Sequence, residues 1–377
     1  MSKTLRGTVN LPGSKSESNR ALMIAAYGGF PLEAYNLSEA HDTVLLKAIL
    51  SDTSLREGVV DCEDAGTVAR FLLTYLAGKP GNWLLTGTER LRQRPMAPLI
   101  DTLRQLGASI QEPLRIVGKP VIGGSVTLDV SQSSQFASSL LLAAPTWERG
   151  LHLTLIGAPV SLPYLEMTLK MMEHFGVHVD RNGNTIVVAH QPYLKRPFKV
   201  SADWSAASYW YEMMALSDGG ELLLKGLTEH SLQGDAIVAE WFKPLGVATS
   251  FDEQGARLTK VATDNQGLVF DFTDYPDLFP AVYATCWALH INADFKGLST
   301  LSTKESDRLT ALKTELARIP ENAAMPLPVF HAYNDHRIAM AMAALWPIFG
   351  TIKVDDPSVV AKSYPGFWGE LNNINWD

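Results

Sequence analysis

The chain has 377 residues, of which 46% are hydrophobic and 19% are charged, with 40 acidic residues against 32 lysines and arginines. This length predicts two or three domains, and the hydrophobic content excludes a disordered chain. The net charge of -8 argues against a nucleic-acid-binding protein, because such domains are usually basic. Two cysteines are too few for a disulfide framework or a four-thiolate metal site.

The N-terminal stretch MSKTLRGTVNLPGSKS carries charges but lacks the apolar core of a signal peptide. The longest apolar stretches are about 13 residues, shorter than the ~20 that a membrane-spanning helix requires. The sequence therefore predicts a cytoplasmic protein without a membrane partner.

Along the chain, a strand-like run ends six times in small polar residues, and a helix rich in Ala, Leu or Met then begins. These helix starts are expected near Ser14, Asp64, Ser133, Trp204, Asp277 and Asp335. Each is followed by a second expected helix, and the six segments are DTVLLKAIL, MAPLIDTLRQLG, LPYLEMTLKMMEHFG, LQGDAIVAEWFKPLG, ESDRLTALKTELARI and SYPGFWGELNNI.

Short alternating segments such as SVTLDV and TIVVAH predict strands between these helices. Three of the second helices end in a glycine that suits the position after the last helical residue, namely Gly107, Gly176 and Gly246. The pattern predicts a packed α/β protein in which a unit of two helices and about four strands is used six times. An ordinary α/β protein with evenly spaced helices is the alternative that the pattern leaves open.

Cations lie at or near several of these helix starts, where the positive end of the helix dipole disfavours them. The residues are Lys15, Arg20, Lys304, Arg308, Arg337 and Lys362. A bound anion would explain them, because free backbone N–H groups and cations can share one anionic ligand. Each residue taken alone could equally be a solvated charge or the partner of a nearby carboxylate.

Other common site motifs are missing from the sequence. No GxxxxGK[ST], GxGxxG, HExxH or GxSxG pattern occurs, and the nine histidines show no metal-ligand spacing. Neither a metal nor another cofactor is therefore expected, and carboxylates, lysines and arginines must supply the chemistry.

Several motifs together resemble those of the 5-enolpyruvylshikimate-3-phosphate synthase family, over nearly the whole chain. The matching segments are LPGSKSESNRAL (11–22), AGTVARF (65–71), LTGTERLRQRPM (85–96), SSQF (133–136), SLPYLEMTL (161–169), SLQGD (231–235), YPD (275–277), KESDRL (304–309), YNDHRIAM (333–340) and AKSYPGFWGEL (361–371). The first and last of these, with KESDRL and SSQF, are specific in combination, whereas AGT or YPD alone would be weak.

The resemblance implies a two-domain inside-out α/β barrel built from six βαββαβ repeats, three in each domain. One domain would comprise residues 1–13 with 201–377, and the other would comprise 14–200. The active site would lie in the cleft between them. The family transfers the enolpyruvyl group of phosphoenolpyruvate to the 5-hydroxyl of shikimate-3-phosphate through a tetrahedral intermediate, so the partners would be small anions. The chain is expected to be a monomer.

The family pattern also assigns site residues. Shikimate-3-phosphate would contact Lys15, Ser16, Arg20, Ser133, Ser134, Gln135, Ser161, Asp277 and Lys304. Phosphoenolpyruvate would contact Lys15, Gly66, Arg94, Gln135, Arg308, Arg337 and Lys362. The catalytic residues would be Asp277 for the hydroxyl proton, Glu305 for the proton delivered to carbon, and Lys15 as an assisting group. From the residues alone, Asp277 could be a turn residue and Glu305 could stabilise the first turn of a helix.

Four positions depart from the family pattern, namely Asp64, Gln93, Leu162 and Thr300. Two of them, Asp64 and Thr300, leave open a catalytically silent paralogue that binds a phosphorylated ligand or a partner. The sister enzyme that uses UDP-N-acetylglucosamine is a further alternative, although the segment 114–124 lacks the reactive cysteine of that enzyme. An RNA-end cyclase with a related repeat is disfavoured by the acidic charge and the lack of a catalytic histidine signature.

Overall fold

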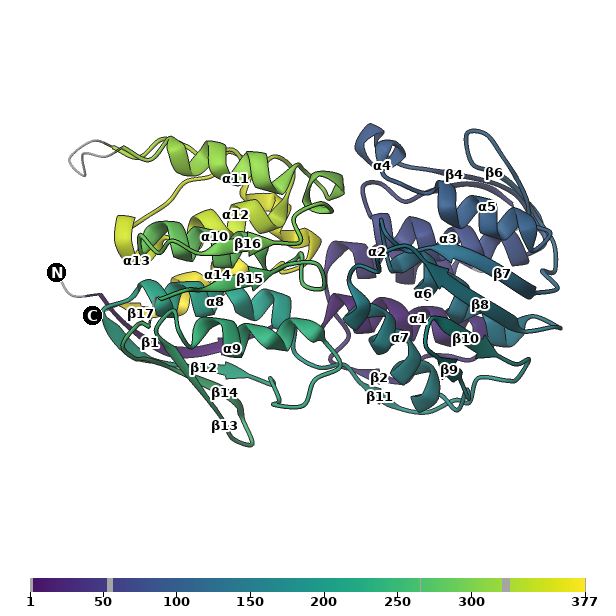
Figure 1. The fold of residues 1–377 in the computed structure, drawn as a ribbon, viewed down its shortest axis with the longest axis horizontal. Coiled ribbons are helices and arrows are strands. Elements are labelled where there is room, and N and C mark those ends of the chain that lie inside the picture. The colour runs from purple at the N-terminus through teal and green to yellow at the C-terminus, as the bar shows by residue number, and fades with distance from the viewer. Residues whose placement is uncertain (1–2, 53–56, 265, 321–325, 377) are drawn as a thin grey trace. The chain divides into compact units, whose positions relative to one another are not determined.

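The computed structural model describes residues 3–52, 57–264, 266–320 and 326–376. The chain divides into two compact units (Figure 1). The terminal unit comprises Met1–Ser14, Glu39–His41 and Ser201–Asp377, and the inserted unit comprises Lys15–Ser38 and Asp42–Val200. This division differs from the expected residue ranges at Ser14 and at Glu39–His41.

Two four-stranded sheets of the inserted unit share one pattern. The first has the order β3 (Gly58–Asp61), β4 (Gly81–Thr86), β6 (Arg115–Gly118), β5 (Ser109–Gln111), and the second has the order β7 (Gly124–Asp129), β8 (Leu151–Ile156), β10 (Thr185–Val188), β9 (Asp180–Asn182). In each sheet the first two strands are parallel and the other pairings are antiparallel. A further parallel pair joins β2 (Ala34–Tyr35) to β11 (Phe198–Lys199).

Three helices of the inserted unit contact one another, and most of their residues are buried. They are α1 (Lys15–Gly28), α3 (Gly66–Gly78) and α6 (Gln135–Ala143). The segments of α3 and α6 are apolar on most sides, which suits them to the interior of the unit, whereas the first half of α1 buries the polar residues Glu17, Ser18, Asn19 and Arg20. The remaining helices are α2 (His41–Ser51), α4 (Glu89–Gln93), α5 (Ala97–Gln105), η1 (Ala144–Thr146) and α7 (Leu162–His174).

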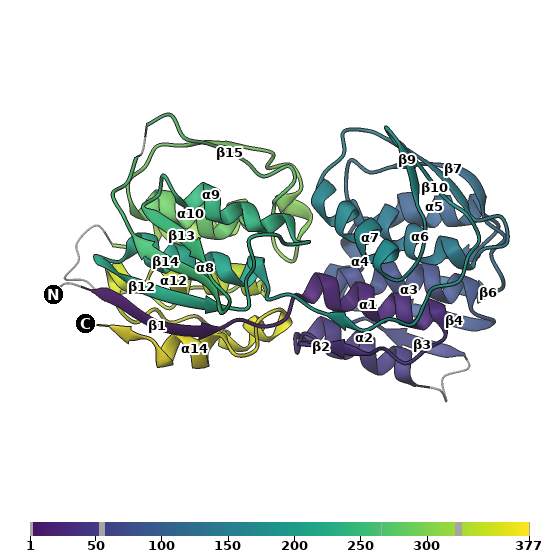
Figure 2. The same cartoon turned by 90° about the horizontal axis from the view of Figure 1, so that it is seen from below.

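The main sheet of the terminal unit repeats the same strand pattern. Its order is β13 (Val247–Phe251), β14 (Gly255–Lys260), β12 (Gly219–Lys225), β1 (Thr4–Asn10), β17 (Asn375–Trp376). Strands β1 and β12 are parallel, and β14 pairs antiparallel with both β12 and β13. Helix α14 (Phe367–Asn373) packs on β1 (Figure 2). A separate parallel pair joins β15 (Val269–Asp271) to β16 (Asp294–Lys296).

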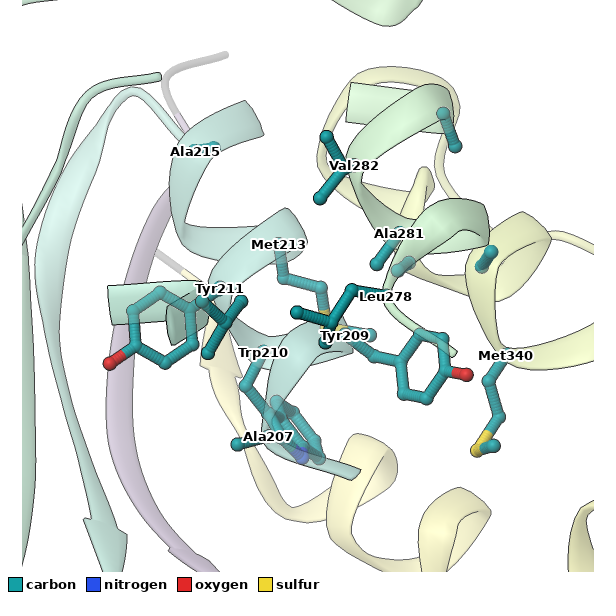
Figure 3. Close-up of a cluster of buried hydrophobic side chains, with 14 of the residues drawn as sticks. Ala207, Tyr209, Trp210, Tyr211, Met213, Ala215, Leu278, Ala281, Val282 and Met340 are labelled. Carbon is teal, nitrogen blue, oxygen red and sulfur yellow. The ribbon is translucent and has the colours of Figure 1, made fainter. Parts of the chain in front are cut away.

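The terminal unit also has three mutually packed, buried helices, which are α8 (Trp204–Leu216), α10 (Phe279–Ala288) and α12 (His336–Ala344). The other helical segments are η2 (Gly234–Ile237), α9 (Val238–Phe242), η3 (Leu301–Thr303), α11 (Arg308–Ala317), α13 (Trp346–Phe349) and η4 (Pro357–Lys362). Figure 3 shows Tyr209 and Met213 of α8 beside Leu278, which immediately precedes α10. Burial of each such large side chain contributes about 1.5–3 kcal/mol to folding.

The sequence placed most of these elements, with one clear difference. Gly107 and Gly176 follow the caps of α5 and α7 with φ values of 93° and 87°, which confirms their expected helix-ending role. Gly246 also has a positive φ of 93°, but the helix before it, α9, already ends at Phe242. The expected helix in LQGDAIVAEWFKPLG is instead η2 followed by the five-residue α9, because Gly234 and Pro244 disfavour a long helix there. None of the described helices is long and apolar enough to cross a membrane.

Candidate active site

The N-terminus of α3 is crowded by two arginines in the inserted unit. A Cβ added to Gly66 would lie 2.6 Å from Nη1 of Arg94 and 3.0 Å from Nη1 of Arg70. The residue before the helix, Ala65, provides no side-chain cap. Unsatisfied backbone N–H groups and two guanidinium groups at one helix start are a combination that suits an anion.

Gln135 connects this helix start to α6. Its Oε1 accepts a hydrogen bond from Arg70 Nη1 at 2.7 Å, and its Nε2 donates to Thr67 Oγ1 at 3.0 Å. Its backbone N–H donates to Ser133 Oγ at 3.2 Å. The structure therefore brings Gln135 and Ser133 close to Arg70, and Arg70 and Arg94 both lie beside Gly66.

Arg20 of α1 is held between α6 and α7, and its residue is 1% exposed. Its guanidinium donates to Thr168 Oγ1 at 2.7 Å, to the Tyr164 carbonyl at 3.0 Å and to the Ser16 carbonyl at 3.0 Å. Burial lowers the pKa of Arg20 to about 10, so the group is still charged at neutral pH. A buried cation whose main acceptors are neutral favours an anionic ligand nearby.

Three further polar residues of the inserted unit lie at helix starts. Lys15, the first residue of α1, donates through Nζ to Asp42 Oδ2 at 3.0 Å, and Asp42 is 2% exposed. Ser161 precedes α7 and has a left-handed φ of 56°. Residues other than glycine seldom adopt this backbone conformation, and those that do are often found at functional sites. Ser134 precedes α6 and provides no side-chain cap.

In the terminal unit, Arg308 forms hydrogen bonds with three carboxylates. It donates to Asp277 Oδ1 at 2.8 Å through Nη1, to Glu305 Oε2 at 2.7 Å through Nη2, and to Asp335 Oδ2 at 2.8 Å through Nε. Burial opposes the charge of Arg308, but these three carboxylates outweigh it and raise the pKa of the guanidinium above its usual range. Arg308 therefore orders both predicted acid–base residues.

Asp277 contacts three cations of the terminal unit. Arg337 Nη2 donates to its Oδ2 at 2.7 Å, and Lys304 Nζ lies 3.9 Å from its Oδ1. Burial on its own raises the pKa of Asp277, but Arg337, Lys304 and Arg308 together hold that pKa well below its ordinary value. Asp277 is thus ionised at every ordinary pH and available to accept a proton.

Glu305 lies before α11 and not in its first turn. The helix begins at Arg308, and Asp307 caps it by accepting a hydrogen bond from the backbone N–H of Thr310. The carboxylate of Glu305 is 12% exposed and is oriented by Arg308. Glu305 therefore does not stabilise the first turn of the helix, a role that the sequence alone had left open.

The last predicted cation, Lys362, ends η4, which packs against α12, and the residue is 6% exposed. Of the departures from the family pattern, Thr300 is 6% exposed, and its hydroxyl has no hydrogen-bond partner among the described residues. Gln93 is exposed and contacts Glu89, while Leu162 is the first residue of α7. Within the described ranges, no group of His, Cys, Asp or Glu side chains could hold a metal ion.

Four charged residues of these clusters were not assigned from the sequence. Arg70 binds Gln135, Asp42 binds Lys15, and Asp335 binds Arg308. Asp235 is 1% exposed and accepts a hydrogen bond from Ser205 Oγ. Burial, with the nearby charge of Asp277, raises the pKa of Asp235 to about 6. Arg70, Asp235 and Asp335 lie inside motifs that resemble those of the family, so their place in these motifs could have identified them from the sequence. No sequence feature pointed to Asp42.

Comparison with known proteins gives a consistent result. The model of the EPSP synthase family (3-phosphoshikimate 1-carboxyvinyltransferase) matches residues 33–371. A 3-phosphoshikimate 1-carboxyvinyltransferase of Bacteroides fragilis (strain YCH46) is 42% identical, covering 99% of this chain and 96% of the relative. One of Methanospirillum hungatei is 32% identical, with 96% and 94% covered. A solved EPSP synthase from Acinetobacter baumannii has the same α/β fold, with a TM-score of 0.75, 21% identity and coverage of 100% and 98%.

Proposed function

The chain belongs to the EPSP synthase family, and on that premise we propose that it transfers the enolpyruvyl group of phosphoenolpyruvate to the 5-hydroxyl of shikimate-3-phosphate and releases phosphate. This reaction belongs to the shikimate pathway of aromatic amino-acid biosynthesis. The observation that carries the proposal is the arrangement around Arg308, which orients two carboxylates beside further cations. An acid–base pair among cations is what a reaction between two anionic substrates requires.

The proposed binding groups differ between the substrates. Shikimate-3-phosphate contacts Lys15, Ser16, Arg20, Ser133, Ser134, Gln135, Ser161, Asp277 and Lys304. Phosphoenolpyruvate contacts Lys15, Gly66, Arg94, Gln135, Arg308, Arg337 and Lys362. The starts of α3 and α6 lack side-chain caps, and Lys15 is the first residue of α1, which supports anion binding at these three helix starts.

In the proposed chemistry, the 5-hydroxyl oxygen attacks C2 of phosphoenolpyruvate while Asp277 accepts the hydroxyl proton. Glu305 donates a proton to C3, which becomes a methyl group in the tetrahedral intermediate. The C2–O bond to phosphate then breaks, the leaving phosphate takes the proton that Asp277 had accepted, and Glu305 takes back a proton from the methyl group to restore the double bond. Lys15 assists proton transfer. Anions bound to Arg337 and Lys304 offset their charge, which raises the pKa of Asp277 and makes it a stronger base.

The fold supports a repeated organisation. In the described residues, parallel pairings occur between β2 and β11, β3 and β4, β7 and β8, β1 and β12, β15 and β16, and Phe330 and Val354. Three of these pairs extend into sheets with one shared strand order. We infer from them a six-repeat inside-out α/β barrel with three repeats in each unit. A cytoplasmic monomer acting on small anions fits this proposal.

Steady-state phosphate release with both substrates tests the function. Phosphate should appear only when phosphoenolpyruvate and shikimate-3-phosphate are both present, and omission of either substrate is the control. UDP-N-acetylglucosamine should not replace shikimate-3-phosphate. The variant Glu305→Gln should lose most turnover while still binding shikimate-3-phosphate in a calorimetric titration. Absence of release above background at saturating substrates would contradict the proposal.

A further inference from the structure

The segment that leads into α12 contains two consecutive residues in a strained conformation. Tyr333 and Asn334 have φ values of 55° and 52°, in the left-handed region that residues with a side chain rarely occupy. Asparagine tolerates this region better than tyrosine does. Such a turn persists only where the surrounding contacts impose it.

Glu315, in the last turn of α11, provides one such contact. The residue is fully buried. Its Oε1 accepts a hydrogen bond from the Tyr333 hydroxyl at 2.7 Å, and its Oε2 accepts one from the His331 backbone N–H at 3.0 Å. Arg318 forms an ion pair with the same Oε2 and donates to the Val329 carbonyl at 2.9 Å. One buried carboxylate thus binds both ends of the three-residue segment 331–333.

The backbone on either side of the strained turn is also bonded. Asp355 accepts hydrogen bonds from His331 Nδ1 and from the Ala332 backbone N–H, both at 2.8 Å. The backbone N–H of Asp335 then donates to the Ala332 carbonyl at 2.8 Å. The turn therefore has little freedom to relax while the Tyr333 hydroxyl remains bound to Glu315.

The turn leads directly into the start of α12, which carries Arg337, a residue predicted to bind phosphoenolpyruvate. Asp335 caps α12 by accepting a hydrogen bond from the Arg337 backbone N–H at 3.0 Å, and it also binds Arg308. Two residues after the cap, the Arg337 guanidinium binds Asp277. A change in the turn would displace the helix start and, with it, this guanidinium.

We propose that Glu315 is a positioning residue for Arg337, acting through the Tyr333 hydroxyl and the left-handed turn at Tyr333–Asn334. The inference rests on the proposed function, because the ligand of Arg337 is assigned there as phosphoenolpyruvate. Glu315 itself touches neither substrate in this scheme. Its effect should fall on phosphoenolpyruvate, whereas residues of the inserted unit make most contacts with shikimate-3-phosphate.

The first test is Tyr333→Phe, which removes one hydroxyl and leaves the ring. The KM for phosphoenolpyruvate should rise about 3- to 10-fold, the size of one lost hydrogen bond, while the KM for shikimate-3-phosphate stays within about twofold. Glu315→Gln should act in the same direction, because its amide has one acceptor oxygen where the carboxylate has two. Tyr283→Phe, in α10 of the same unit, is the matched control and should leave both KM values unchanged.

A second pair of variants tests the role of the strained backbone. Tyr333→Gly and Tyr333→Ala both lose the hydroxyl and the ring, but only glycine adopts the left-handed conformation without cost. Tyr333→Gly should therefore have a lower KM for phosphoenolpyruvate than Tyr333→Ala. Equal values in the two variants would contradict a role for the turn.

The outcomes separate the inference from the proposed function. A wild-type protein without phosphate release would overturn the proposed function, and the inference with it. With an active wild type, an unchanged KM for phosphoenolpyruvate in Tyr333→Phe and Glu315→Gln would overturn the inference alone. Equal rises in both KM values would also overturn it, since they indicate a general structural defect, which thermal denaturation of the same samples would show.

Discussion

Arg337 donates a hydrogen bond through Nη2 to Oδ2 of Asp277 at 2.7 Å, across 60 residues of sequence. The contact joins a predicted binding cation to the predicted base. While it persists, the pKa of Asp277 is held low by Arg337, together with Lys304 and Arg308, against the opposing effect of burial. Substrate binding to these cations is therefore coupled to the basicity of Asp277.

Replacement of Asp277 by Asn tests this role. The variant keeps the shape of the side chain but cannot accept the hydroxyl proton, so kcat should fall about 10²- to 10⁴-fold. The loss in kcat should exceed any change in either KM, and phosphate release at saturating substrates measures it. Asp274→Asn, in the same loop, should retain kcat within about twofold. A near-normal kcat in Asp277→Asn would assign proton removal to another group.

Arg308→Met should destabilise the protein, because it leaves Asp277, Glu305 and the buried Asp335 without their shared cation. Removing one member of a buried ion pair typically costs about 3–5 kcal/mol. Urea unfolding should show a loss of this size in the free energy of unfolding. Lys313→Met, at an exposed position of the same helix, should change it by no more than about 0.5 kcal/mol. A loss below about 1 kcal/mol in Arg308→Met would contradict the structural role.

Gly66→Ala should weaken phosphoenolpyruvate binding, since the added methyl group must displace Arg94 from a 2.6 Å approach and Arg70 from 3.0 Å. We expect the KM for phosphoenolpyruvate to rise about tenfold, with the KM for shikimate-3-phosphate nearly unchanged. Gly78→Ala, at the other end of α3 where an added Cβ meets nothing within 4 Å, is the control.

The stability of the protein should depend on pH through Asp235. Its pKa is raised from 3.8 to about 6 in the folded chain, by burial first and then by Asp277. Below pH 3.8, Asp235 is protonated in both the folded and the unfolded chain. Above pH 6 it is ionised in both, but only in the folded chain is the charge buried, which destabilises that state. The free energy of unfolding should therefore fall by about 3 kcal/mol as pH rises through this window.

The variant Asp235→Asn isolates that effect, because its amide stays neutral at every pH. Denaturation curves of the wild type and the variant should diverge between about pH 4 and pH 7, with the variant relatively more stable at the higher value. The exposed Asp294→Asn variant should run parallel to the wild type. Parallel curves for Asp235→Asn would show that Asp235 does not titrate in this window.

The sequence by itself determined the α/β class, the order of the buried helices and the family, because apolar periodicity, helix-ending glycines and contiguous motifs are local features. It placed Asp277, Glu305 and Arg308 in motifs but could not show that Arg308 binds both carboxylates and Asp335 as well. It also predicted one continuous helix in LQGDAIVAEWFKPLG, where the structure has two short helical segments.

Only the tertiary structure decided which partner each charged side chain has. Asp42 reaches Lys15 across 27 residues, and Arg70 reaches Gln135 across 65. Such pairings depend on how buried helices pack, and packing is set by the whole chain at once. The same applies to the bond between Glu315 and Tyr333 and to the strained turn after it, because no local preference favours a left-handed tyrosine. The sequence therefore predicted which residues take part in the chemistry, and the packing of the helices determined how those residues are arranged.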